Sequence, residues 1–311
     1  MKDLIKLPQI EFYLLGFVLM YLVKIKECDK AKVLSTDMIK RILVTSSRNL
    51  DSILAFTYFY FARCSELLGE LKLIRPQLFE AYRRSCLKRD EIGQATIINL
   101  LLRNYIKFKD YSFANQLMGQ SSFPENKSNN QNIRYLYYTA LIKAVQMEYG
   151  EAFARVMQAI RKAPQKGLGF KIAAQKLGVV VELLLGQIPN RNLFSKTEYL
   201  KPLFSYYKLC QAVWKGDLGE YMEVVKKYSR IYEKDQLLIL IRRLSSNVIK
   251  TGLRRINASY SRISFKDVAA KLNLQENTDV EFIIAKAIRD GVIRATISHQ
   301  EQHITIVVRL L

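Results

Sequence analysis

The feature that most constrains the fold is a helical pattern that recurs about every 40 residues. A tyrosine, an alanine three residues later and a final proline occur at Tyr111, Ala114 and Pro124 and again at Tyr149, Ala152 and Pro164. A small residue where two helices cross, with a proline after the second helix, is typical of stacked helical hairpins. An irregular helical domain is the alternative interpretation.

The rest of the first 235 residues is consistent with this pattern. Apolar residues recur at spacings of three and four in segments such as 97–105 and 136–145. The breaks between segments are short and contain Gly, Pro, Asn or Ser, as in GQIPNRN (186–192). Weaker copies of the repeat surround Ala31 and Tyr221. The sequence therefore predicts a mainly α protein in which residues 1–235 form a TPR-like solenoid of helical hairpins.

The pattern changes in residues 236–311, which predict a winged helix with a small β-wing. One long amphipathic helix from Leu237 is followed by the short β-compatible piece YSRI and by FKDVAAKL, for which Ser264 is the expected N-cap. Thr278 is the expected cap of DVEFIIAKAIRD, and Gly291 ends that helix. VIRATIS and HITIVVRL then alternate as two strands of a hairpin.

The chain has a formal net charge of +21, but the predicted winged helix carries little of it. Residues 256–299 include six basic and five acidic residues, which gives this segment a net charge of +1. Asp279 and Glu281 stand at the start of the candidate recognition helix. Phosphates would be repelled there, so this module is not expected to grip DNA. The charge lies instead as scattered basic pairs on the helical repeats, such as Arg83–Arg84 and Lys226–Lys227. Such pairs are usually solvated, although RNA binding stays open as an alternative.

No metal or cofactor site is expected, and the chain is not expected to be an enzyme. The four cysteines are far apart and never form a C-x-x-C pair, and both histidines lie in the last thirteen residues. There is no phosphate-binding Gly-rich loop and no G-x-S-x-G motif. The apolar run Phe12–Val23 is too short to span a bilayer and is flanked by Glu11 and Lys24. We expect it to form a buried helix.

Several long words of the sequence resemble the PCI-domain family, in which a helical-hairpin solenoid runs into a winged helix. They include GQATIINLLLRNY (93–105), RYLYYTALIKAVQMEY (134–149), VVELLLGQIPNR (180–191) and AKAIRDGVI (285–293). Among PCI proteins they are most similar to subunits of the proteasome regulatory lid, and they stand in the order that this family has.

The resemblance implies a non-catalytic scaffold in the cytoplasm and nucleus. Its implied partners are other PCI subunits of the lid and the lid deubiquitinase module, with the base ATPases contacted indirectly and no small-molecule substrate or membrane. In this family the winged helices pair edge to edge. The alternative is a PCI adaptor of another complex that binds RNA.

The winged-helix outline also suggests which residues form the pairing surface. HITIVVRL is apolar, and we expect it to present an exposed strand edge, which an isolated soluble protein would avoid. The predicted edge and its core-facing support comprise Ile293, Ile297, Ile304, Ile306 and Val308. On this basis a proline at Ile306 would remove a strand donor and abolish pairing.

Overall fold

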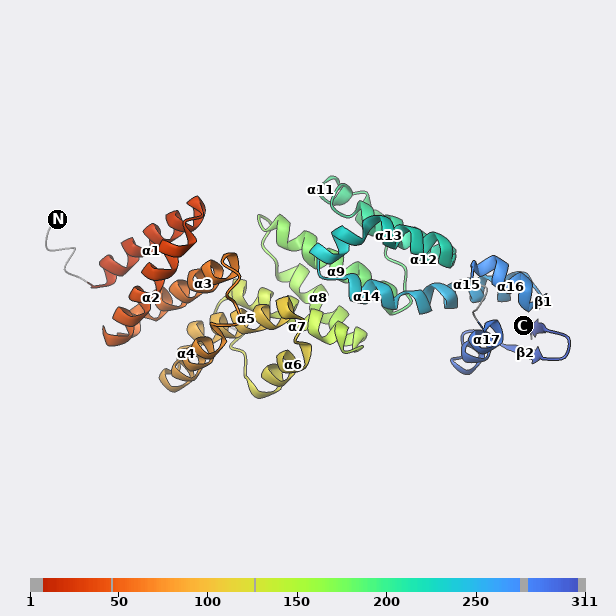
Figure 1. Ribbon diagram of the computed structural model, residues 1–311, viewed down its shortest axis with the longest axis horizontal. Helices are drawn as coiled ribbons and strands as arrows, with labels where there is room; N and C mark the ends of the chain where they lie inside the picture. The colour runs from red at the N-terminus through yellow and green to blue at the C-terminus, as the bar shows by residue number, and fades with distance from the viewer. Residues whose placement is uncertain (1–7, 46, 126, 275–278, 307–311) are drawn as a thin grey trace. The chain divides into compact units, whose positions relative to one another are not determined.

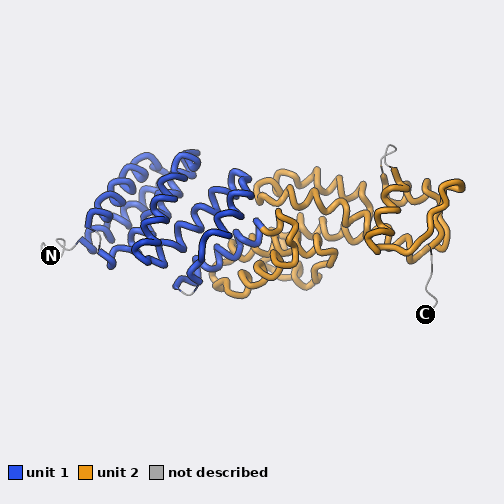
Figure 2. The backbone as a smooth tube through the Cα atoms, turned by 90° about the horizontal axis from the view of Figure 1, so that it is seen from below, with its two compact units in different colours: residues 1–142 blue, residues 143–311 orange. Residues whose placement is uncertain are grey.

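The computed structural model describes residues 8–45, 47–125, 127–274 and 279–306, which form a succession of helices followed by a small sheet (Figure 1). The chain divides into two compact units, residues 1–142 and 143–311, which are coloured separately in Figure 2. The mainly α class, the TPR-like hairpins and the small C-terminal wing are confirmed.

In unit 1 the helices pack as successive hairpins. Its elements are α1 (Pro8–Ile25), α2 (Cys28–Thr45), the short 3-10 helix η2 (Arg48–Leu50), α3 (Asp51–Leu67), α4 (Arg75–Lys88), α5 (Glu91–Phe108), α6 (Tyr111–Gln120) and α7 (Asn129–Val145), whose last turn belongs to unit 2. Helix α3 packs against both α1 and α5, while α2 packs against α1 and α3, and α4 packs against α5.

Unit 2 continues the hairpins and ends in the winged helix. Its elements are α8 (Tyr149–Lys162), α9 (Leu168–Leu184), the short α10 (Arg191–Phe194) and α11 (Thr197–Leu200), α12 (Phe204–Lys215), α13 (Leu218–Lys234), α14 (Leu238–Arg243), α15 (Ser245–Ser259), β1 (Arg262–Ser264), α16 (Phe265–Leu272), α17 (Val280–Arg289), β2 (Ala295–Ser298) and β3 (His303–Ile306).

One type of tight turn joins several successive helices. The residue two positions before the next helix has a left-handed backbone at Lys26, Arg89, Lys109, Met147, Gly216 and Gln236. At the first of these, the N–H of Glu27 reaches back to the carbonyl of Leu22 at 3.1 Å, as in a Schellman motif. After Lys26, Lys109, Met147 and Gly216 the fourth residue of the following helix is buried, at Ala31, Ala114, Ala152 and Tyr221 respectively. These are the four positions predicted from the repeat.

Helix α1 differs from the prediction of a buried helix. Phe12, Gly16 and Leu19 are buried against the neighbouring helices, but Tyr13 and Phe17 are 58% and 48% exposed. The sequence shows that this helix is apolar on all sides, but it does not show how many neighbouring helices cover it. By length and composition alone this 18-residue helix would also suffice to cross a membrane, a criterion that core helices of globular proteins also meet.

Two further details of unit 2 differ from the sequence prediction. The long helix expected from Leu237 is broken into α14 and α15 at Leu244, whose buried side chain anchors the bend. The predicted cap Thr278 lies outside the described residues. In the structure Asp279 caps α17, since its Oδ1 accepts from the N–H of Phe282 at 3.2 Å. Ser264 caps α16 as predicted.

The winged helix is joined to the preceding helices by a backbone contact between two glycines. A Cβ added to Gly216, in the turn before α13, would lie 2.5 Å from the backbone N of Gly252 in α15. A Cβ at Gly252 would meet the Gly216 carbonyl oxygen at 2.6 Å and also the side chain of Leu272. Beside this contact, Asn273 donates to Asp217 at 2.9 Å, while Lys250 pairs with Asp290 at 3.0 Å.

Substituting Gly252 with alanine should therefore destabilise unit 2. We expect Gly252→Ala to lower its free energy of unfolding by about 3 kcal/mol, because the new methyl overlaps both backbone and Leu272. Urea unfolding followed by the fluorescence of Trp214, the single tryptophan, measures this unit. The control Gly169→Ala, which has open space around it in α9, should leave stability unchanged or raise it by up to about 1 kcal/mol. Equal unfolding midpoints for the two variants would contradict the close contact.

Asp217 should contribute stability that depends on pH. Burial alone would raise the pKa of this carboxyl, but donors from Asn273 and from the N–H groups of Glu220 and Gly219 outweigh it and hold the pKa below 3.8. A carboxyl with a lowered folded pKa stabilises the protein above its unfolded pKa and loses this effect as pH falls through the folded pKa.

The matching variant is Asp217→Ala. At neutral pH it should lose about 1–2 kcal/mol, the usual cost of removing an N-cap. The difference from wild type should shrink as pH is lowered below 3.8. Urea titrations across this range measure the effect, with Glu223→Ala on the exposed side of the same helix as the control. A difference that does not change with pH would show that the ionised carboxylate is not responsible.

Candidate protein-interaction site on the winged helix

The three strands of the wing form one antiparallel sheet in the order β1-β3-β2. Ile263 of β1 and Ile297 of β2 both lie opposite Ile304 of β3, one on each side. The prediction that the HITIVVRL segment presents an exposed edge is therefore wrong for His303–Ile306. The physical reason is the short strand Arg262–Ser264, which covers the side of β3 that a two-stranded hairpin would leave open.

The free edge belongs instead to β2, and the register shows which backbone groups face outward. The N–H of Ile306 donates to the Ser261 carbonyl at 2.8 Å, so the backbone groups of Ile306 face β1. Hydrogen-bonded and non-hydrogen-bonded pairs alternate along an antiparallel ladder. It follows that Thr305 bonds to Thr296 of β2, and that the N–H and C=O of Ala295 and Ile297 face away from the sheet. We call this outer side of β2, residues 295–298, the wing edge.

The structure separates the five residues predicted for the pairing surface. Ile293 and Ile304 are buried in the core of the winged helix, together with Leu253, Val268, Leu272 and Ile284. Ile297 packs partly against this core from the wing edge itself. Ile306 is buried in the central strand, and Val308 lies outside the described residues. Proline at Ile306 would break the β1–β3 ladder, so it does not test pairing as predicted.

Charged side chains around the wing are paired with one another. The carboxylate of Glu281 at the start of α17 lies 2.8 Å from Nδ1 of His299 in the wing turn. Arg262 of β1 pairs with Glu301 at 2.8 Å. The N-terminal end of α17 carries two acidic residues, Asp279 and Glu281. Because these carboxylates would repel phosphate groups, this surface is not suited to binding nucleic acid.

Neither a metal-ligand cluster nor a reactive buried thiol is found among the described residues. They include no group of three or more His, Cys, Asp or Glu side chains placed to hold a metal ion. Burial raises the pKa of the Cys64 thiol to about 11 and that of the Cys210 thiol to about 12. Both thiols are therefore protonated at neutral pH and are poor nucleophiles. What the wing does offer is a row of backbone groups on β2 for which the described residues supply no partner.

Sequence reasoning missed the wing edge because it treated the sheet as a hairpin. The signal was present in YSRIS, which was predicted as a β-compatible piece but was not given a place in the sheet. In a sheet of three strands one strand must be central. Which strand this is depends on pairing between residues that lie far apart in the sequence, such as Ile263 and Ile304.

Comparisons with known proteins agree with this architecture. Residues 1–210 match the family profile described as PSMD3-like, N-terminal TPR repeats, and residues 225–307 match the PCI domain. The predicted boundary between residues 235 and 236 is not tested by these ranges and stays a prediction.

Relatives from distant organisms match nearly the whole chain. A probable 26S proteasome non-ATPase regulatory subunit 3 of Anopheles gambiae is 43% identical over 295 residues, which is 94% of this chain and 60% of that protein. The 26S proteasome non-ATPase regulatory subunit 3 of Dictyostelium discoideum is 41% identical over 94% of this chain and 58% of its own length. The probable subunit 3 of Drosophila melanogaster is 44% identical over 92% and 58%.

The chain thus spans about 60% of the length of the curated relatives it matches. The match to the TPR repeats precedes the match to the PCI domain, just as the helical hairpins precede the winged helix in the structure. The chain belongs to the family of the 26S proteasome non-ATPase regulatory subunit 3.

Proposed function

We propose that this chain is a non-catalytic scaffold subunit of the lid of the 26S proteasome regulatory particle. In this proposal it assembles with other PCI subunits through its winged helix and supports the degradation of ubiquitinated proteins in the cytoplasm and nucleus. The observation that carries the proposal is the wing edge, a row of outward N–H and C=O groups on a winged helix whose phosphate-binding positions are acidic.

Pairing at the wing edge is β-augmentation. A strand from another PCI subunit that lies along β2 would satisfy the outward backbone groups of Ala295 and Ile297, extending the sheet beyond its third strand. Main-chain hydrogen bonds supply affinity in such pairing, and neighbouring side chains supply specificity. The exposed Thr296 and half-buried Ile297 are the side chains of β2 that a partner strand would meet.

The join between the winged helix and the preceding hairpin suits a scaffold. Gly216 touches Gly252, and Asn273 bonds to Asp217, so the wing is fixed relative to α12 and α13 within unit 2. A partner that binds a preorganised edge avoids the entropic cost of ordering it. In the proposed assembly the neighbours are other lid PCI subunits and the deubiquitinase module, with the base ATPases reached indirectly.

The net charge of +21 favours RNA binding as a second candidate function. Basic residues without an acidic partner among the described residues include Arg191 and Arg255, both placed over the ring of Trp214. RNA affinity from such groups would fall steeply as salt rises. The acidic entrance of α17 argues against nucleic acid at the winged helix itself.

Proline substitutions in β2 test the wing edge. Ala295→Pro should remove an outward N–H without breaking the β2–β3 ladder, so the protein stays folded and pairing is lost. Thr296→Pro removes an inward donor and should instead lower the melting temperature. Native mass spectrometry of the chain coexpressed with the other lid PCI subunits measures assembly, and circular dichroism measures folding. Normal assembly of a folded Ala295→Pro variant would exclude pairing through this edge.

One affinity purification distinguishes the scaffold function from the RNA-binding function. The tagged chain is recovered from its own cells with and without nuclease treatment, and its partners are identified by mass spectrometry. We expect lid and base subunits in both samples, because protein pairing does not depend on nucleic acid. Partners that disappear after nuclease treatment would support the RNA-binding alternative and count against the scaffold.

A further inference from the structure

One face of α3 carries a row of side chains that line two pockets and are partly exposed. Ser52, Ile53 and Phe56 line a pocket shared with α1, and Phe59, Arg63 and Glu66 line a pocket shared with α5. Positions separated by three and four residues lie on the same face of a helix, so the two pockets share one surface of α3. We call this surface the α3 groove. It lies wholly within unit 1 and does not involve the wing edge.

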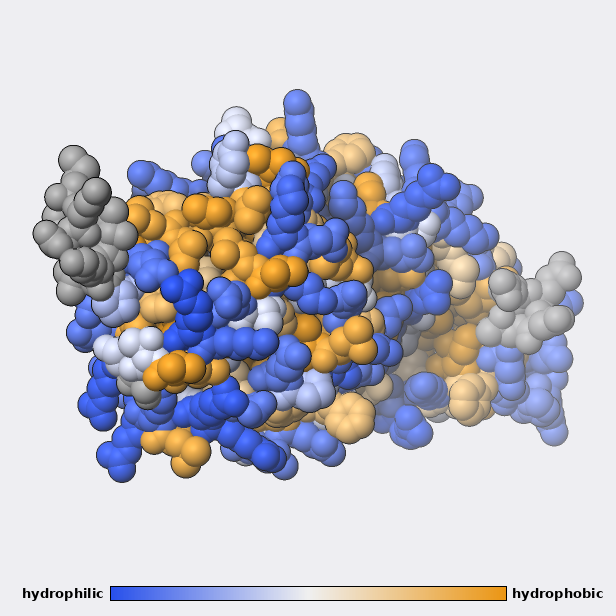
Figure 3. Space-filling view, turned by 60° about the vertical axis from the view of Figure 1, so that its left-hand side comes forward, coloured by the Kyte–Doolittle hydropathy of each residue, from blue (hydrophilic) through white to orange (hydrophobic). Residues whose placement is uncertain are grey.

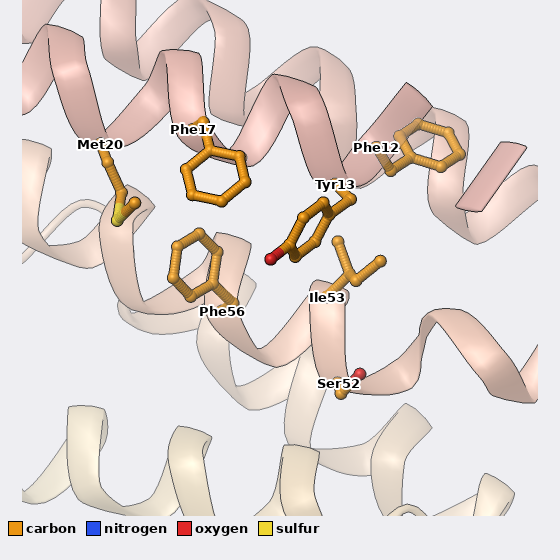
Figure 4. Close-up of a pocket in the computed structure, with 8 residues that line it drawn as sticks. Phe12, Tyr13, Phe17, Met20, Ser52, Ile53 and Phe56 are labelled. Atoms are coloured by element: carbon orange, nitrogen blue, oxygen red, sulfur yellow. The ribbon is translucent and has the colours of Figure 1, made fainter. Parts of the chain in front are cut away.

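The end of the α3 groove that adjoins α1 is apolar and aromatic. Its pocket has a volume of about 290 Å³ and is shown in Figure 4, where Phe17 of α1 and Phe56 of α3 point toward one another with Tyr13 beside them. Gly16 allows this approach, since a Cβ there would lie 3.3 Å from the Phe56 ring. Figure 3 shows hydrophobic side chains gathered over this end of unit 1. An exposed aromatic patch of this kind marks an interaction site.

The other end of the α3 groove is cationic. Its pocket, of about 220 Å³, contains the Glu66 carboxylate, which is bound by Arg63 at 2.9 Å, Arg103 at 3.1 Å and Lys107 at 3.5 Å. Burial alone would raise the pKa of Glu66, but Arg103 and Arg63 outweigh it and hold the pKa below its ordinary value. One carboxylate therefore faces three cations, and each cation is about 40% exposed or more.

Arg134 of α7 extends this positive charge. Its guanidinium lies over the Phe59 ring at 5.2 Å, and it forms no ion pair with any described residue. Phe59 thus lies between the aromatic end of the α3 groove and its positively charged end. The groove as a whole presents an apolar half on α1 and α3 and a half with excess positive charge on α3, α5 and α7.

We propose that the α3 groove is a docking site for an amphipathic helix of a partner protein, one that carries carboxylates at one end of its apolar stripe. The apolar stripe covers Tyr13, Phe17 and Phe56, and the carboxylates pair with Arg103 and Arg134. Helix-in-groove recognition uses apolar anchors at helical spacing, which fits two rows of aromatic side chains on neighbouring helices. Complementary charge at one end then fixes the direction in which the helix binds.

The same observations disfavour two other occupants. A second copy of this chain would bring another cationic surface of a protein with net charge +21, and like charges would oppose pairing. RNA bases bind by stacking on open aromatic faces. At the apolar end the rings of Phe17 and Phe56 are turned toward each other, and the cations lie at the opposite end.

The test uses the full chain and four fluorescein-labelled peptides. All are short amphipathic helices with the same leucine stripe. Two carry a cluster of glutamates, at the N-terminus or at the C-terminus, and the other two carry a cluster of lysines at the same positions. Fluorescence anisotropy measures affinity. We expect one acidic peptide to bind at least about tenfold more tightly than its lysine counterpart. Phe17→Ser should weaken its binding about tenfold, whereas Arg103→Gln with Arg134→Gln should abolish the difference between the peptides.

Leu87→Ser is the matched control, because Leu87 is 86% exposed on α4 of the same unit and lies outside the groove. It should bind all the peptides like wild type, and circular dichroism confirms that every variant is folded. Equal affinity for the acidic and the lysine peptides, or no binding of any, would overturn the proposal. So would a concentration-dependent dimer abolished by Phe17→Ser, or binding of labelled oligouridine that is lost in the arginine variant.

Discussion

The contact between Gly216 and Gly252 determines where the winged helix sits on the helical hairpins of unit 2. Two backbones approach so closely there that no side chain fits on either residue. The turn before α13 is thereby locked against the middle of α15, the helix that leads directly into β1. Asp217 uses the adjacent position to cap α13 and to hold Asn273 at the end of α16. The wing is thus fixed to its support from two sides.

The same type of turn recurs without glycine elsewhere in the chain. Lys26, Lys109 and Met147 adopt the left-handed conformation that Gly216 adopts, at a cost of about 1–2 kcal/mol each. These residues are tolerated because the following helix can then place a small residue against its neighbour, as Ala114 does with no exposed surface. The apolar area buried where the helices cross closely offsets the free-energy cost of the left-handed turns. Glycine is required only at Gly216, where a second backbone occupies the side-chain position.

Local patterns in the sequence predicted the hairpins and the winged helix, because capping, small residues and helical periodicity act between near neighbours. Ser264 and the repeat around Ala114 and Ala152 are examples. Features that depend on distant residues were not predicted. The exposed side of α1 depends on which helices lie around Tyr13, and the central position of β3 depends on its pairing with Ile263. Neither is recorded in the local pattern, since packing and strand order join residues far apart.

The strand order also determines when, during translation, the three-stranded sheet of the wing can form. The ribosome makes β1 first and β2 second, but both bond only to β3, which is made after them. Until residues 303–306 have left the ribosome, neither outer strand has its partner, and the sheet cannot form. The edge of β2 therefore becomes an ordered surface only once the wing is complete. A nascent chain still lacking β3 has no wing to offer a neighbour, so the pairing proposed above would begin only after translation has passed this point.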